Sequence, residues 1–149
     1  MKIAVVHGPN LRLLGRREPD IYGSDTLEEI NQALQGLASE LGVELDIFQS
    51  NHEGEILDFL EVASGTAGGV LINPAGLTHT SVSLRDALLG IGIPAVEIHL
   101  SNPAARERFR HRSLLASAAV GTVAGFGKNS YLLGLRALTA HLTNTKTRP

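Results

Sequence analysis

The chain has 149 residues, a length that fits one domain, and 43% of its residues are hydrophobic while only 4% are aromatic. Its formal net charge of −2 and its scattered arginines argue against a nucleic-acid partner, and the absence of cysteine excludes disulfides, thiolate nucleophiles and cysteine-ligated metals. No segment has the length and apolarity of a signal peptide or a membrane span, so we expect a cytoplasmic protein without a membrane partner.

Five short apolar runs, rich in β-branched residues or alanine, predict β-strands. They are Ile3–Val6, Val43–Phe48, Gly69–Ile72, Ala95–Ile98 and Ala119–Ala124. Segments with helical spacing begin near Asp25–Thr26, with Asp25 as N-cap, near Gly54, Ser81 and Lys128, and in short form after Pro103. Strands that alternate with helices indicate a parallel sheet covered on both faces. The sequence therefore predicts a single flavodoxin-like, doubly wound α/β domain with a five-stranded parallel sheet over residues 1–149.

Polar residues directly follow four of the predicted strands. They are His7-Gly8-Pro9-Asn10, Gln49-Ser50-Asn51-His52, Asn73-Pro74 and His99-Leu100-Ser101-Asn102. Because ligands of such sheets bind outside the carboxyl ends of the strands, we expect these segments to form one functional rim. The connection at residues 8–24 is longer than most strand-to-helix loops and is predicted to be an active-site lid, whereas the polar residues 143–149 are predicted to be a flexible tail.

Arg17 and Tyr22 lie within this predicted lid and suggest an oxygen base. A phenol is a poor base at neutral pH, because its reference pKa is about 10. A guanidinium held close to it favours the phenolate and does not itself lose a proton. The alternative is a surface arginine beside a tyrosine that packs into the loop.

Glu97 and His99 project from the same side of the fourth strand, because side-chain direction alternates along a strand. His99 is a natural acid–base group, and Glu97 can orient it through a hydrogen bond. Asn73, His79 and Asp86 have the paired donors and acceptors that a polyol substrate needs. In the alternative interpretation, the residues after His79 only cap a helix, and Asp86 belongs to a solvated face.

Two other functions remain open at this point. His79, His99 and the acidic residues near them could hold a metal ion in a hydrolase, although the chain has no HExxH-like pairing. A flavin or nucleotide could bind after the first strand, although Gly8-Pro9-Asn10 lacks the spaced glycines and the lysine of nucleotide-binding loops. A third feature is the group Arg106, Arg108, Arg110 and Arg112, of which we expect at most one or two to contact a ligand carboxylate.

Ordered motifs along nearly the whole chain resemble those of the type II 3-dehydroquinate dehydratases, also called type II dehydroquinases. They are Gly8-Pro9-Asn10-Leu11, Arg17-Glu18-Pro19, Tyr22-Gly23, Gln49–Gly54, Thr78–Ser81, Leu84–Ala87, Glu97–Asn102 and Phe109-Arg110-His111. The resemblance implies a hydro-lyase that converts 3-dehydroquinate to 3-dehydroshikimate and water by trans elimination through an enolate, with no Schiff base, metal or cofactor. The three lysines, Lys2, Lys128 and Lys146, independently disfavour a Schiff base, because none is expected in a desolvated pocket.

The resemblance also assigns roles. Tyr22, assisted by Arg17, removes a proton beside the ketone, His99 protonates the departing hydroxyl, and Asn10 holds a water that supports the enolate oxygen. The residues implied to bind substrate are Asn73, His79, Asp86, Leu100, Ser101 and Arg110, with Arg110 for the carboxylate. The family implies a homododecamer built from trimers, in shikimate-pathway biosynthesis of aromatic amino acids or in quinate catabolism. His7 and Ala104 depart from the family pattern, which usually has asparagine and histidine there.

Overall fold

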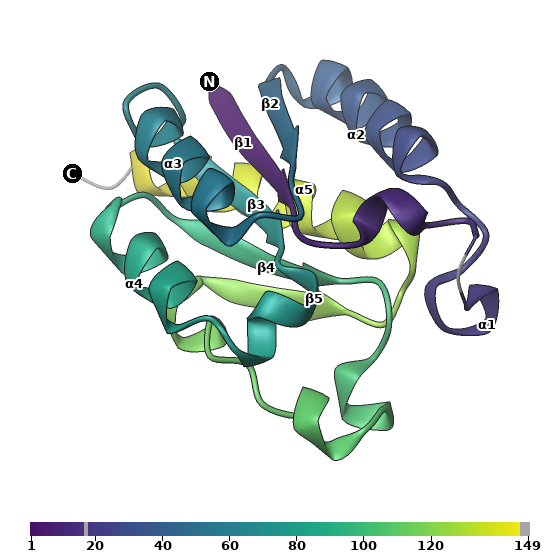
Figure 1. The fold of residues 1–149 in the computed structure, drawn as a ribbon. Helices are drawn as coiled ribbons and strands as arrows, with labels where there is room; N and C mark the ends of the chain where they lie inside the picture. The colour runs from purple at the N-terminus through teal and green to yellow at the C-terminus, as the bar shows by residue number, and fades with distance from the viewer. Residues whose placement is uncertain (17, 147–149) are drawn as a thin grey trace.

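Five parallel strands form the centre of the protein. The computed structural model describes residues 1–16 and 18–146. The strands are β1 (Lys2–His7), β2 (Glu44–Gln49), β3 (Gly69–Asn73), β4 (Ala95–His99) and β5 (Gly121–Ala124), and they pair in the order β2-β1-β3-β4-β5 (Figure 1). The predicted flavodoxin-like α/β sheet is therefore confirmed.

Helices cover both faces of this sheet. Figure 1 shows α2 (Leu27–Leu41) and α5 (Lys128–Lys146) against one face, and α3 (Glu53–Ser64) and α4 (Val82–Gly90) against the other. Alternate residues of β1 enter the two resulting cores, with Ile3 packed beneath α2 and α5 and Ala4 beneath α3 and α4. Burial on both faces explains why β1 is continuously apolar.

Shorter helical elements occupy the connections. The predicted lid at residues 8–24 contains a 3-10 turn at Leu11–Leu13 and the short helix α1 (Pro19–Tyr22), which stands away from the sheet in Figure 1. Further 3-10 turns are Ala75–His79, Pro103–Ala105, Arg108–Arg110 and Ala116–Ala118. None of the helices in residues 1–16 and 18–146 is both long enough and apolar enough to cross a membrane.

The ends of some elements differ from the sequence-based boundaries. Thr26, and not Asp25, caps α2 by accepting a hydrogen bond from the Glu29 amide at 3.2 Å, and Asp25 instead pairs with Lys128 Nζ at 3.4 Å. A 3-10 turn at Ala116–Ala118 precedes β5, and the strand begins at Gly121 instead of the predicted Ala119. Helix α5 continues through Lys146 into the segment predicted as a tail, and residues 147–149 lie outside the described part of the chain.

Gly134 allows α5 to lie close to the sheet. A Cβ at this position would lie 2.2 Å from Ile98 Cδ1 and 3.0 Å from Leu71 Cδ1, and both of those side chains are fully buried. Gly36 is an equivalent helical glycine on the exposed face of α2, where a Cβ would meet nothing within 4 Å.

Gly134→Ala is expected to lower the free energy of unfolding by about 1–2 kcal/mol, because the cost of overpacking exceeds the gain in helix propensity. The matched variant Gly36→Ala should raise it by about 0.5–1 kcal/mol, since only the helix propensity changes. Chemical denaturation of both variants measures the two effects. A Gly134→Ala protein as stable as the parent would contradict the packing argument.

Candidate active site

A cavity of about 160 Å³ opens at the carboxyl ends of β1, β3 and β4. This is the rim at which ligands of doubly wound sheets bind. Leu11 and Leu14, both buried, form part of its apolar wall. The predicted site residues that line the cavity are Asn10, Tyr22, Asn73, His79, His99, Leu100, Ser101 and Arg110. Residues far apart in the sequence thus meet at one place.

Among the predicted site residues that the structure describes, two do not line this cavity. Asp86 lies on the exposed face of α4, with its carboxylate 3.9 Å from Arg85 Nη1. The buried face of α4 carries Leu84 and Leu88, and Asp86, midway between them in sequence, points the other way. Glu97 lies beneath the cavity and reaches it only through His99. Arg17 lies outside the described residues.

A buried carboxylate holds the imidazole of His99. Glu97 is 1% exposed, and its Oε1 lies 2.5 Å from His99 Nε2. The other carboxylate oxygen accepts a hydrogen bond from Ser113 Oγ at 2.9 Å. An ionised carboxylate only accepts, so Nε2–H is the donor, and Nδ1 remains to exchange a proton with a bound molecule. Ser113 has no recognisable signal in the sequence, because its role arises only from this contact.

Tyr22 ends α1 and lies next to a guanidinium that the sequence did not single out. Arg106 Cζ is 4.9 Å from the centre of the Tyr22 ring, and Arg106 Nη1 donates to Ser101 Oγ at 3.4 Å. The Arg106 side chain is only 12% exposed and lines the same cavity. This places the Arg106 guanidinium over the face of the Tyr22 ring. The only sequence signal for Arg106 was its membership of the arginine cluster.

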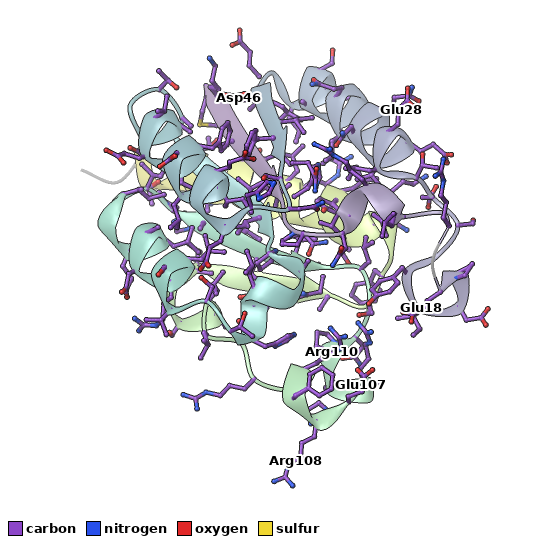
Figure 2. The ribbon with its side chains drawn as sticks, in the orientation of Figure 1. Glu18, Glu28, Asp46, Glu107, Arg108 and Arg110 are labelled. Carbon is purple, nitrogen blue, oxygen red and sulfur yellow. The ribbon has the colours of Figure 1, made fainter. Side chains whose placement is uncertain are left out.

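The arginine cluster divides between the cavity and the solvent. Arg106 and Arg110 line the cavity, whereas Arg108 points away from the molecule in Figure 2. Arg110 Nε donates to Glu107 Oε2 at 2.7 Å. A backbone hydrogen bond and this bond from Arg110 lower the pKa of Glu107 below its ordinary value of 4.5. Arg110 is therefore held in place while its remaining N–H groups can bind an anion.

His79 is oriented by the same segment. Its Nδ1 lies 2.7 Å from the carbonyl oxygen of Arg112, which can only accept, so Nδ1 carries the proton. The unprotonated Nε2 is then an acceptor for a hydroxyl group. The sequence predicted His79 as a polyol ligand, and this tautomer suits that role.

The loop after β1 is tied to its neighbours. The Asn10 amide donates to Asn51 Oδ1 at 2.9 Å, and Gln49 Nε2 donates to the Gly8 carbonyl at 3.2 Å. A Cβ on Gly8 would lie 2.5 Å from the Pro74 carbonyl oxygen, so only glycine permits this approach. Gln49 and Asn51, expected on the functional rim, thus support the loop and do not line the cavity.

His7 lies beneath the cavity and is fully buried. Its Nε2 is 2.8 Å from Asn31 Oδ1, and its Nδ1 is 2.7 Å from the hydroxyl of Tyr131. Burial lowers the pKa of His7 from 6.5 to about 4, although the hydrogen bond with Asn31 opposes this shift. The imidazole is therefore neutral at neutral pH.

The protein is expected to lose stability as pH falls from 6.5 to 4, because His7 protonates in the unfolded chain before it does so in the folded one. Above pH 6.5 the residue is neutral in both states and this loss is absent. The loss attributable to His7 is about 3 kcal/mol at pH 4. Urea denaturation of the parent and of His7→Asn at pH 7 and pH 4 isolates the contribution of His7 to this loss of stability. Equal pH dependence in both proteins would contradict the assignment.

The organisation described so far is that of an α/β enzyme, with a candidate acid on a strand and a candidate base on a connecting segment facing one cavity. Comparison with known proteins agrees with this class. The family model described as dehydroquinase class II matches residues 1–139. The chain therefore belongs to the class II dehydroquinase family of enzymes.

Individual relatives extend over nearly the whole chain. The 3-dehydroquinate dehydratase of Geotalea daltonii is 55% identical over 142 residues, which are 95% of this chain and 99% of the relative. That of Desulforudis audaxviator is 57% identical over 137 residues, which are 92% of this chain and 91% of the relative. The crystal structure of the type II dehydroquinase from Butyrivibrio crossotus matches with a TM-score of 0.91 at 38% identity and covers 93% of this chain and 97% of its own.

Proposed function

We propose that this protein removes water from 3-dehydroquinate to form 3-dehydroshikimate. The observation that carries the proposal is the presence of Tyr22 and His99 in one cavity, the first beside the Arg106 guanidinium and the second bonded to the buried Glu97. An elimination needs one group that takes a proton and another that gives one. The names of relatives that are 55% and 57% identical support the choice of substrate.

The proposed reaction is a trans elimination through an enolate. Tyr22, as phenolate, takes a proton from the carbon beside the ketone, and the electron pair of the broken C–H bond forms the enolate. The enolate then reforms the ketone as the C–O bond to the hydroxyl group breaks. His99 gives its proton to the departing oxygen, which leaves as water. No bond to the protein and no metal is needed in this sequence of steps.

The surroundings of each group favour its role. Arg106, together with Arg17 as predicted from the sequence, stabilises the phenolate of Tyr22. Glu97 accepts the hydrogen bond from His99 Nε2 and so orients the ring, which leaves Nδ1 as the nitrogen that gives a proton to the leaving group. Asn10, which lines the cavity and whose loop is anchored by Asn51, is proposed to hold a water near the enolate oxygen.

The remaining lining residues are proposed to bind the substrate. His79 accepts a hydrogen bond from a hydroxyl group, and Arg110 pairs with the carboxylate. Leu100 and Ser101 supply backbone and hydroxyl groups at the end of β4. Residues 8–24 carry Tyr22 and are proposed to act as the lid, so closure would also bring the base to the substrate.

The protein is proposed to assemble as a homododecamer built from trimers. This proposal bears on Asp86, because its carboxylate is on the outer face of α4 and does not line the cavity of its own chain. Asp86 can contribute to substrate binding only at the cavity of a neighbouring copy. The exposed apolar residues Val82 and Leu89 on the same helix are consistent with burial by such a neighbour.

The parent protein is expected to convert 3-dehydroquinate with a rise in the ultraviolet absorbance of the conjugated enone product. Tyr22→Phe and His99→Ala should each lower kcat by about 10²–10⁴-fold, since this is the usual contribution of a positioned acid or base. As controls, borohydride, which traps imines, and a metal chelator should leave the rate unchanged. No rise in absorbance with the parent protein would refute the proposed function.

The two neighbouring arginines Arg106 and Arg108 provide a matched pair. Arg106→Leu should lower kcat by about tenfold or more, because the phenolate loses a partly desolvated cation. Arg108→Leu should leave kcat unchanged, since this side chain points into solvent (Figure 2). Steady-state kinetics of both variants decides the matter, and similar kcat values for the two would show that Arg106 has no special role.

A further inference from the structure

A buried series of hydrogen bonds leads from α2 to the cavity, and the proposed reaction does not use it. Asn31 on α2 contacts His7 at the end of β1, and His7 contacts Tyr131 on α5. Tyr131 in turn interacts with the side chain of Asn73, which lines the cavity; this interaction lowers the pKa of the Tyr131 phenol, against the larger rise caused by burial. His7 and Tyr131 are 0% exposed, and Asn73 is 4% exposed.

The chemistry of the partners sets the direction of every bond in this series. Asn31 Oδ1 can only accept, so His7 Nε2 carries the proton and His7 Nδ1 is an acceptor. The Tyr131 hydroxyl must therefore donate to Nδ1, which leaves its oxygen lone pairs as acceptors. A donor is then required from Asn73, and only its amide nitrogen can supply one.

The oxygen of the Asn73 amide also has a hydrogen-bond partner. Its Oδ1 accepts a hydrogen bond from the Ala75 backbone amide at 3.1 Å. Because Oδ1 faces the Ala75 amide, the amide nitrogen is on the side that interacts with Tyr131, and an N–H is the group that remains for a bound molecule. Reversal of the amide would break the bond to Ala75 and turn an acceptor oxygen toward the Tyr131 oxygen, which costs at least one buried hydrogen bond.

We propose that His7 and Tyr131 are positioning residues that fix Asn73 as a hydrogen-bond donor toward the ligand. The group that Asn73 recognises is then an oxygen that accepts, such as a carboxylate, a ketone or a hydroxyl lone pair. The kinetic part of this inference rests on the proposed function, since it takes 3-dehydroquinate as the ligand. The orientation of the amide does not depend on the substrate.

Substitution of His7 tests the inference, because asparagine and leucine are similar in size but only asparagine can form hydrogen bonds. His7→Asn retains one donor and one acceptor and can replace both contacts. His7→Leu retains neither, so the Tyr131 hydroxyl is free to turn and donate to Asn73, against the required orientation. Tyr131→Phe removes the acceptor for the Asn73 amide altogether.

The expected result is a change in KM with little change in kcat, because Asn73 holds the substrate equally before and during the reaction. His7→Leu and Tyr131→Phe should each raise KM for 3-dehydroquinate by about tenfold, as expected for one misdirected buried hydrogen bond. His7→Asn should retain the parent KM within about threefold. In the Tyr131→Phe background, His7→Leu should have no further effect on KM, because the connection is already broken.

Several results would overturn the inference. They are a His7→Leu protein with the parent KM, a His7→Asn protein as impaired as His7→Leu, and independent effects of the two substitutions in the double variant. If Tyr131→Phe does not fold, the comparison of His7→Asn with His7→Leu still tests the inference. Thermal denaturation confirms that each variant assayed is folded.

A measurement without substrate separates this inference from the proposed function. Nitrogen-15 NMR of the histidine rings in the free protein should show His7 as the neutral tautomer with the proton on Nε2, and Tyr131→Phe should change its Nδ1 signal. A proton on Nδ1 would overturn the inference even if the enzyme is active. A protein that lacks activity but shows the expected tautomer would refute only the proposed function.

Discussion

The parallel pairing of β1, β3 and β4 is the constraint on which the site depends. It makes His7 the register partner of Asn73 and Glu97 the partner of Ile72, so the ends of all three strands lie at one edge. Alternation then points His99 and Glu97 to the same side of β4. A shift of one residue in any of these strands would send the same side chains to the opposite face.

The two halves of the proposed chemistry lie on different kinds of structure. His99 is on a buried central strand, where Glu97 and Ser113 hold its ring through consecutive hydrogen bonds. Tyr22 is on a short helix within a long connection, next to Arg106. The proposed acid is thus positioned by the core. The proposed base is positioned by side chains from another connection, and Ser101, bonded to Arg106, links the two halves.

Much of the fold and the site could be predicted from local patterns. The five apolar runs correspond to the five strands, and eight of the predicted site residues line one cavity. Helix boundaries were less accurate, because Asp25 and Thr26 are both good caps and only the contact of Asp25 with Lys128 distinguishes them. The supporting residues Arg106, Ser113 and Tyr131 could not be assigned, since their partners lie on separate segments.

The sequence by itself determined the class of sheet, the segments at its carboxyl edge and the chemical groups available there, because these follow from periodicity, strand order and residue type. The tertiary structure alone decided which groups meet. It placed Asp86 on the outer face of α4, brought Arg106 to Tyr22, and enclosed His7 between Asn31 and Tyr131. The physical reason is that hydrogen bonds and charge contacts depend on distances of a few ångströms between side chains, and these distances are set by packing between elements that the sequence separates.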